Sequence, residues 1–196
     1  PLLSAAHRFL MMPDLLAYFL TGIARGERTN AVSPQLYAAN TGQWSAEMIG
    51  RLGLPRAIFP ELVDPGTVLG PLDGRVCGQV GLGQAAVIAP CTHDTAAAVA
   101  AVPGAGEGVA LISSGTWSIL GTCADRLYTS PEALAAGIAN ELSYRGGFIC
   151  RNLAGMWLVQ QARAAWERQG ASYSYEDLVA LAAEANGGGP LIDVAD

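Results

Sequence analysis

The sequence predicts an α/β protein, and three features of its central stretch carry that prediction. Residues 85–90 (AAVIAP) form a short apolar run that is typical of a buried strand. The segment TAAAVAAV, which begins at Thr95, is helix-forming, and residues 109–112 and 117–121 look like two further strands separated by a turn. Strand-like and helix-like segments that succeed one another along the chain indicate the α/β class.

Two helices are predicted before this stretch. Pro13 suits the first position of a helix that runs to Leu20 and stops at Gly22. Ser45 can cap a second helix that Gly53 ends. The first helix should carry on one face Leu15, Leu16, Phe19 and Leu20, and the second should turn inward Met48, Ile49 and Leu52. Residues 64–84 are rich in glycine and predict connecting structure or short strands.

Two more helices are predicted after the central stretch. The longer one runs from Asn152 to about Gln169 and stops at Gly170. A last helix begins near Ser174, where Asp177 suits a capping box, and ends at glycines 187–189. The longer helix also carries two aromatic residues that are most simply core residues, Trp157 and Trp166.

Composition narrows the possible functions. The chain has 196 residues, of which 51% are hydrophobic and 14% charged, so a substantial core is expected in one large domain or parts of two. A net charge of −6 argues against binding nucleic acid. All 11 basic residues are arginines, which excludes a P-loop lysine or a Schiff-base lysine within these residues.

The cysteines and the opening segment give no sign of a metal centre or a membrane span. Four cysteines without metal-ligand spacing, together with two histidines, predict reduced thiols in a cytoplasmic protein. No apolar run reaches the roughly 18 residues that a membrane span needs. Charged residues interrupt the apolar N-terminal segment, residues 1–20, which lacks a signal-peptide pattern. Because the sequence begins with Pro1, we expect a piece of a longer chain.

The first candidate site is Thr92-His93-Asp94-Thr95, at the end of the predicted central strand and the start of a helix. Ligands gather at the carboxyl ends of strands in open α/β sheets, so Asp94 could be the base of a phosphoryl transfer. Asp94 could instead cap the helix that begins at Thr95, and position alone favours the cap. His93, taken alone, is better explained as a hydrogen-bonded structural residue.

Two weaker candidates follow. Residues 113–116 (SSGT) form a turn whose backbone N–H groups could bind phosphate, although an ordinary hairpin turn is the better explanation of these residues taken alone. Asn152, Gly155 and Gln160 lie around the predicted start of the long helix, where the helix N-terminus favours anions and Gln160 could face a base or a sugar.

Taken in order, these segments resemble the FGGY carbohydrate kinases, and their residues are those typical of the rhamnulokinase group. The resemblance covers nearly the whole chain. It rests on RFLMMPDLLAYFLTG, TNAVSPQLYAANTGQW, GLPRAIFPELVDPGTVLGPL, VIAPCTHDTAAAVAAVP, ISSGTWSILG and NLAGMWLVQQARAAW. The HDT and SSGTWS runs are among the most telling.

The resemblance implies an actin-like ATPase (ribonuclease H-like) fold with an active site between two lobes. It implies ATP- and Mg²⁺-dependent phosphorylation of a ketose, in this group the 1-hydroxyl of L-rhamnulose. Asp94 would accept the proton and His93, Asp94 and Thr95 would contact the sugar. Asn152 would lie near the substrate, and Thr116 and Gln160 would contact ATP. The family's Asp-x-Gly phosphate and metal motif and its adenosine-covering glycine-rich segment should lie outside these residues.

One segment departs from the group's pattern. NLAG stands where the group usually has NIMG, which keeps the Asn and the Gly.

Three alternative functions remain, and the resemblance also implies a division of the chain into two lobes. Xylulokinase or ribulokinase specificity, a non-catalytic sugar-binding module and a nuclease of related fold are the alternatives. The nuclease would need several clustered carboxylates to bind two metal ions, and Asp94 has no acidic neighbour in the sequence. We expect residues 1–102 in the sugar-binding lobe, 103–196 in the nucleotide lobe, and a linker at 103–108.

Overall fold

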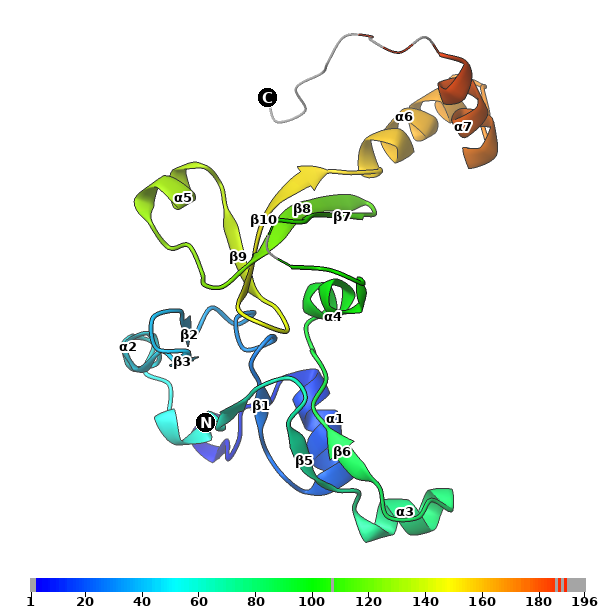
Figure 1. Ribbon diagram of the computed structural model, residues 1–196. Helices are drawn as coiled ribbons and strands as arrows, with labels where there is room; N and C mark the ends of the chain where they lie inside the picture. The colour runs from blue at the N-terminus through cyan, green and yellow to red at the C-terminus, as the bar shows by residue number, and fades with distance from the viewer. Residues whose placement is uncertain (1–2, 107, 186, 188, 190–196) are drawn as a thin grey trace. The chain divides into compact units, whose positions relative to one another are not determined.

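The computed structural model describes residues 3–106, 108–185, 187 and 189. The chain forms two compact units (Figure 1). The first unit comprises Pro1–Leu111 and Gly121–Cys150, and the second comprises Ile112–Leu120 and Arg151–Asp196. The predicted boundary at residue 102 stays a prediction, and Glu107 of the predicted linker lies outside the described residues.

The first unit opens with the short helix η1 (Leu3–Ala5) and the helix α1 (Met12–Thr21). The predicted stop is confirmed, because Gly22 is left-handed at φ 71° and its N–H donates to the Tyr18 carbonyl at 2.7 Å. The predicted apolar face is only partly buried. The buried residue of α1 is Asp14, whereas Leu16 and Phe19 are exposed. Leu16 belongs to the lining of an apolar cavity of about 210 Å³ that α1 shares with strands of the same unit.

The main apolar core of the first unit surrounds Trp44. The helix α2 (Ala46–Arg51) begins as predicted, with the Ser45 hydroxyl accepting the Met48 N–H at 3.2 Å. Of its three residues predicted to point inward, Ile49 is buried but Met48 and Leu52 are exposed, because a two-turn helix offers the core little more than one side chain. The cluster consists of Ala31, Leu36, Trp44, Ile49, Ile58 and Phe59.

Short strands and turns frame this core. The strands β2 (Tyr37–Ala38) and β3 (Gln43–Trp44) pair antiparallel, and the short helix η2 (Arg56–Ile58) follows α2. The Trp44 indole N–H donates to the Pro60 carbonyl at 2.8 Å, which satisfies the polar end of this buried ring. The strand β1 (Gly26–Glu27) pairs parallel with β4 (Leu62–Val63).

The central strand predicted at residues 85–90 exists as β6 (Ala86–Ile88), antiparallel to β5 (Val68–Pro71). The prediction that it is buried is wrong, since Ile88 is 54% exposed. In the described residues β6 is hydrogen-bonded to one neighbouring strand, so much of its surface is left open. The sequence analysis also missed the helix α3 (Gly74–Val80), which Asp73 caps and Gly81 ends.

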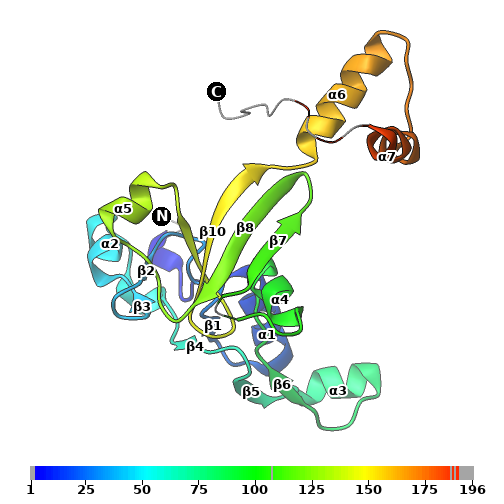
Figure 2. The same ribbon diagram turned by 45° about the horizontal axis from the view of Figure 1, so that its top comes forward.

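A four-stranded sheet follows the helix α4 (Asp94–Ala101), as Figure 2 shows. Its order is β7 (Ala110–Ser114), β8 (Trp117–Ala124), β10 (Gly147–Ala154) and β9 (Ala139–Leu142), with the helix α5 (Pro131–Ala135) between β8 and β9 in the chain. The predicted strands at 109–112 and 117–121 are therefore confirmed as neighbours, although both are longer than predicted. β9 and β10 are antiparallel, with Gly147 opposite Leu142.

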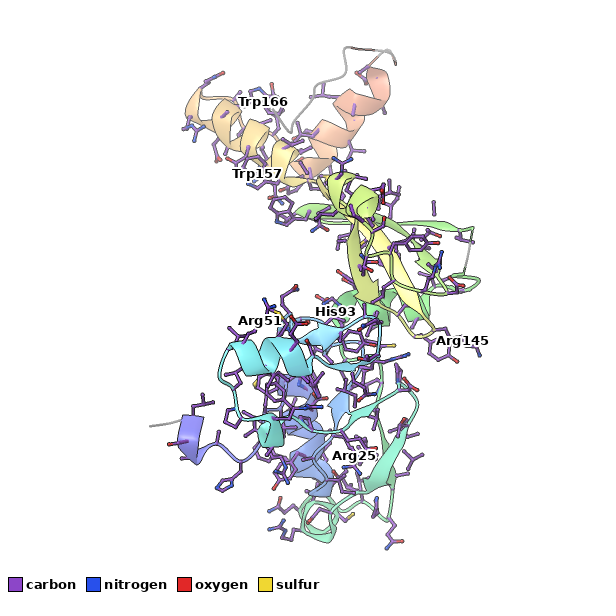
Figure 3. All side chains as sticks on the ribbon, turned by 90° about the vertical axis from the view of Figure 1, so that its left-hand side faces the viewer. Arg25, Arg51, His93, Arg145, Trp157 and Trp166 are labelled. Atoms are coloured by element: carbon purple, nitrogen blue, oxygen red, sulfur yellow. The ribbon has the colours of Figure 1, made fainter. Side chains whose placement is uncertain are left out.

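The long C-terminal helix begins later than predicted. α6 spans Trp157–Arg168, and Asn152 lies on β10 instead of in the helix. Strand pairing extends β10 to Ala154, so the helix can start only after it. Trp157 and Trp166 are 47% and 38% exposed, so the prediction that they are core residues is wrong (Figure 3). Trp166 packs edge-on against Tyr173, with 5.6 Å between ring centroids.

The last helix, α7 (Tyr175–Glu184), confirms the predicted capping box. The Ser174 hydroxyl accepts the Asp177 N–H at 3.1 Å, and the Asp177 carboxylate accepts the Ser174 N–H at 2.8 Å. The helix ends at Glu184, ahead of the predicted glycines, of which residue 188 lies outside the described residues. All four cysteines are free thiols. Within the described ranges, none of the helices has the length and apolarity needed to cross a bilayer.

Candidate active site

The turn between β6 and α4 carries the first candidate site. His93 is the N-cap residue of α4 and Asp94 is its first residue, one position earlier than predicted. Asp94 therefore does not occupy the cap position, although its Oδ1 accepts the Thr95 N–H at 2.7 Å. Its side chain is 96% exposed, so the carboxylate is open to a ligand from solvent.

A buried hydrogen-bond network holds the residues just ahead of Asp94. Glu27, at the end of β1, is 2% exposed, and Thr29 is fully buried. Glu27 Oε2 accepts from the Thr92 N–H at 2.9 Å and from the Thr92 hydroxyl at 2.7 Å. The Thr29 hydroxyl oxygen accepts from the N–H groups of Thr92 and His93 at 3.2 and 3.3 Å.

Sequence reasoning did not find Glu27 or Thr29. They stand in the run GERTNA, which joins an expected helix to a segment of turn formers and gives no periodic sign of burial. The one available signal was a glutamate followed two residues later by a threonine, which lets the Glu27 Oε1 accept the Thr29 N–H at 2.8 Å. That pattern is too common in polar turns to identify a buried network.

Asp14 supports this network from α1. Its Oδ1 accepts the Glu27 N–H at 3.0 Å, which ties the helix to β1. The pKa of Asp14 is raised from 3.8 to about 6, chiefly by burial and also by the nearby Glu27 carboxylate, while hydrogen bonds to the backbone of Glu27 and Met11 oppose the rise. The carboxyl group of Asp14 therefore titrates near neutral pH.

His93 lies between two carboxylates of the first unit. Its Nδ1 is 3.5 Å from Asp94 Oδ1 and 3.7 Å from Glu141 Oε2, where Glu141 is on β9 (Figure 3 labels His93). Both His93 Nδ1 and Glu141 Oε2 are buried, and neither has a hydrogen-bond partner in the part of the chain that the structure describes. Burial, with Glu141 nearby, also raises the pKa of the Cys150 thiol to about 11, so this thiol stays protonated at neutral pH.

The second unit brings the Gly115-Thr116 turn to the start of α6. The Gly115 carbonyl accepts the Met156 N–H at 2.8 Å, and the Thr116 carbonyl accepts the Trp157 N–H at 3.1 Å. A Cβ on Gly155 would stand 2.6 Å from the Gly115 oxygen, so this approach leaves no room for a larger residue. The turn and the helix start are therefore locked together.

The predicted phosphate-binding turn is shorter than expected. Ser113 and Ser114 belong to β7, and the Gly115 N–H donates to the Trp117 carbonyl at 2.8 Å, so this N–H is not free for a phosphate. Thr116 itself is exposed, and Gln160 lies in the first turn of α6, with its N–H donating to the Met156 carbonyl at 2.9 Å.

The predicted site residues thus fall into two groups. His93, Asp94 and Thr95 lie in the first unit, and Thr116, Asn152 and Gln160 lie in the second. Asn152 is an exposed residue of β10, ahead of α6, so the expectation that it sits at the helix N-terminus is wrong. The roles of all six residues stay predictions. Among the described residues, no group of three or more His, Cys, Asp or Glu is placed to hold a metal ion.

Solved structures of sugar kinases share this fold. A xylulose kinase from Rhodospirillum rubrum matches with a TM-score of 0.71 at 19% identity, over 90% of this chain and 36% of that one. A carbohydrate kinase from Novosphingobium aromaticivorans matches with a TM-score of 0.59 at 26% identity, over 74% of this chain and 33% of that one. The chain therefore has the α/β architecture of part of an actin-like ATPase fold.

Sequence comparison defines the family. The N-terminal domain of the FGGY family of carbohydrate kinases matches residues 2–101, and the chain belongs to this family. A rhamnulokinase from Enterococcus faecalis is 40% identical over 195 residues, which cover 99% of this chain and 39% of that protein. A rhamnulokinase from Lactiplantibacillus plantarum is 34% identical over 196 residues, or 40% of its length. The chain thus spans about two fifths of these curated relatives.

Proposed function

We propose that this chain is part of a cytoplasmic, ATP-dependent sugar kinase that phosphorylates L-rhamnulose at its 1-hydroxyl. The similarity to rhamnulokinases extends over essentially the whole chain, which supports this substrate over xylulose or ribulose. The observation that carries the proposed chemistry is the exposed Asp94 carboxylate at the turn between β6 and α4. The buried side chains of Glu27 and Thr29 hold this turn through hydrogen bonds from Thr92 and His93, while the Asp94 carboxylate remains accessible to a sugar hydroxyl.

In the proposed reaction, Asp94 accepts the proton of the 1-hydroxyl as that oxygen attacks the γ-phosphorus of ATP. A new oxygen–phosphorus bond forms, the bond from the γ-phosphorus to the bridging oxygen breaks, and ADP leaves with its electron pair. Such a transfer needs positioning and charge stabilisation more than covalent chemistry by the protein. His93 and Thr95, which flank Asp94, would orient the sugar.

The second unit would bind the nucleotide. Thr116 is exposed on the turn against which α6 begins, and Gln160 lies in the first turn of that helix, so both would contact ATP from one locked junction. Asn152, on the strand that leads into the helix, would contact the substrate. Mg²⁺ would neutralise phosphate charge in such a reaction, but the described residues gather no carboxylate cluster to hold it.

The division into a sugar-binding part (residues 1–102) and a nucleotide-binding part (residues 103–196) belongs to the same proposal. The match of the family's N-terminal domain to residues 2–101 supports it. Residues 103–108 would then link the two parts, with Asp94 one helix ahead of the link.

The proposal is tested by steady-state kinetics of the complete kinase that contains this chain. ADP release is measured with L-rhamnulose, D-xylulose and L-ribulose, and the phosphorylated carbon is identified by ³¹P–¹H NMR. We expect kcat/KM for L-rhamnulose to be highest by about 10-fold or more, a ratio within the reach of one sugar pocket. A preference for another ketose would overturn the substrate, and sugar binding without ATP turnover would support a non-catalytic module instead.

A further inference from the structure

We propose that Glu27 and Thr29 are positioning residues that set the location of Asp94 by holding the backbone of Thr92 and His93. The proposal rests on the proposed function, in which Asp94 is the base. It is carried by hydrogen bonds across 63 to 65 residues of sequence, from the end of β1 to the turn ahead of α4.

The donors and acceptors of this network match one another. An ionised carboxylate accepts hydrogen bonds and donates none, and Glu27 meets four donors, the N–H and hydroxyl groups of Thr29 and of Thr92. The Thr29 hydroxyl donates to Glu27 and accepts from the Thr92 and His93 N–H groups. Because Glu27 and Thr29 are at most 2% exposed, water cannot replace a lost partner.

The Thr29 hydroxyl connects Glu27 to the turn that precedes Asp94. Its hydroxyl oxygen is 3.2 Å from the Thr92 nitrogen and 3.3 Å from the His93 nitrogen, so one atom contacts two successive peptide groups. These two peptide groups immediately precede Asp94. Both belong to the strand-to-helix turn, where their N–H groups have no helical partner.

Asp94 has little else to fix its position. Its side chain is 96% exposed, and its recorded contacts are with its neighbours Thr95 and His93. The placement of its carboxylate therefore follows the backbone of residues 92 and 93. Since a displacement of about 1 Å can lower a rate about 100-fold, loosening this turn should reduce kcat without removing any group that touches the substrate.

A purely structural role is the alternative, because the same bonds also stabilise the first unit. The two roles predict different kinetics. A structural role lowers the stability of the kinase and leaves kcat per folded molecule unchanged. When the Thr29 hydroxyl is removed, a positioning role lowers kcat in fully folded enzyme, keeps KM for the sugar nearly constant, and frees the His93 amide.

The test compares Thr29→Val with Thr29→Ser in the complete kinase. Valine keeps the shape of threonine but lacks the hydroxyl, whereas serine keeps the hydroxyl. For Thr29→Val we expect kcat to fall by about 10- to 100-fold with KM for the sugar within about 3-fold, and for Thr29→Ser we expect kcat within about 3-fold of the parent. Amide hydrogen exchange at His93, whose N–H donates to the Thr29 hydroxyl, should rise at least about 10-fold in Thr29→Val alone, whereas the Thr92 N–H keeps its 2.9 Å bond to Glu27.

The control is Thr21→Val, which removes a partly buried threonine hydroxyl from the same unit, whereas the Thr29 hydroxyl is fully buried. The Thr21 hydroxyl donates to the Ala17 carbonyl at 2.8 Å and accepts the Ile23 N–H at 3.0 Å, and it has no hydrogen bond to residues 92–94. Thr21→Val should lower the melting temperature while leaving kcat and the Thr92 and His93 amides unchanged. If Thr29→Val does not fold, Thr92→Val takes its place, because it removes one donor to Glu27 and keeps the Thr92 N–H.

The possible results separate this proposal from the proposed function. Unchanged exchange at His93, or an equal loss of kcat in the serine and valine variants, overturns the positioning role. Faster exchange with unchanged kcat also overturns it, provided that Asp94→Asn is inactive in the same assay. If Asp94→Asn retains kcat, the assignment of the base has failed, whatever Thr29→Val does to the amides.

Discussion

The buried carboxyl of Asp14 gives the first unit a pH-dependent stability that can be measured directly. Its pKa is raised to about 6 in the folded chain, chiefly by burial, against 3.8 for an unperturbed carboxyl. The folded state therefore binds the proton more tightly than the unfolded state. The contribution of this proton to the free energy of unfolding is fully present below pH 3.8 and is lost as the pH rises through about 6. Stability should therefore fall between these two pH values.

The substitution Asp14→Asn isolates this effect. Asparagine carries no charge, and its Oδ1 can still accept the Glu27 N–H, which is 3.0 Å from the Asp14 oxygen. The difference between the unperturbed pKa of 3.8 and the folded-state pKa of about 6 corresponds to a free energy of at most about 3 kcal/mol. Solvent screening reduces this free energy to roughly 1–3 kcal/mol. At pH 8 the variant should be more stable than the parent by that amount, and at pH 4 the difference should nearly vanish.

Urea unfolding at pH 4, 5, 6 and 8 measures this difference. Asp73→Asn is the control, because the pKa of Asp73 is lowered by its hydrogen bonds to Arg75. Asp73→Asn should show a small difference of the opposite sign, present above pH 4 and lost in acid. If Asp14→Asn is less stable than the parent at pH 8, or if its advantage does not change with pH, the carboxyl is not held in its protonated form by burial.

Two further predictions concern the second unit. Gly155→Ala places a Cβ 2.6 Å from the Gly115 oxygen, so it should destabilise the Thr116 turn by about 1–3 kcal/mol. Amide exchange of Met156 and Trp157 should therefore accelerate. Unchanged exchange would contradict the close packing of Gly155 against Gly115. Ser174→Ala removes one half of the capping box and should cost about 1 kcal/mol in urea unfolding, whereas Ser174→Asp should restore most of it; equal stability of all three chains would argue against the cap.

Local signals in the sequence were sufficient for the helix ends. Gly22 ends α1, Ser45 caps α2, and Ser174 with Asp177 forms the capping box of α7, all as predicted. Each of these features depends on residues within one turn of each other, so the sequence alone contains the information. The same holds for Asp94, whose place at the start of a helix follows from the short apolar run and the helix-forming alanines around it.

Features that depend on distant partners were not predictable in the same way. The segment from Asn152 looks helical by composition, but pairing in the sheet draws it into β10. Leu16 was predicted on the apolar face of its helix and Trp157 in a core, yet both are exposed, because the residue types of one segment do not show what covers them. Glu27 was overlooked for the same reason, since its partner Thr92 is 65 residues away.

The most direct test of the whole account is the turnover of Asp94→Asn in the complete kinase, measured beside its sugar affinity. Removal of a positioned general base should lower kcat by about 10²- to 10⁴-fold, because such a group typically contributes that much. Isothermal titration should show sugar affinity within about 10-fold of the parent, since the amide keeps the size of the carboxylate. A variant with near-normal kcat and only a lower melting temperature would contradict the account and leave Asp94 as a residue of the helix start.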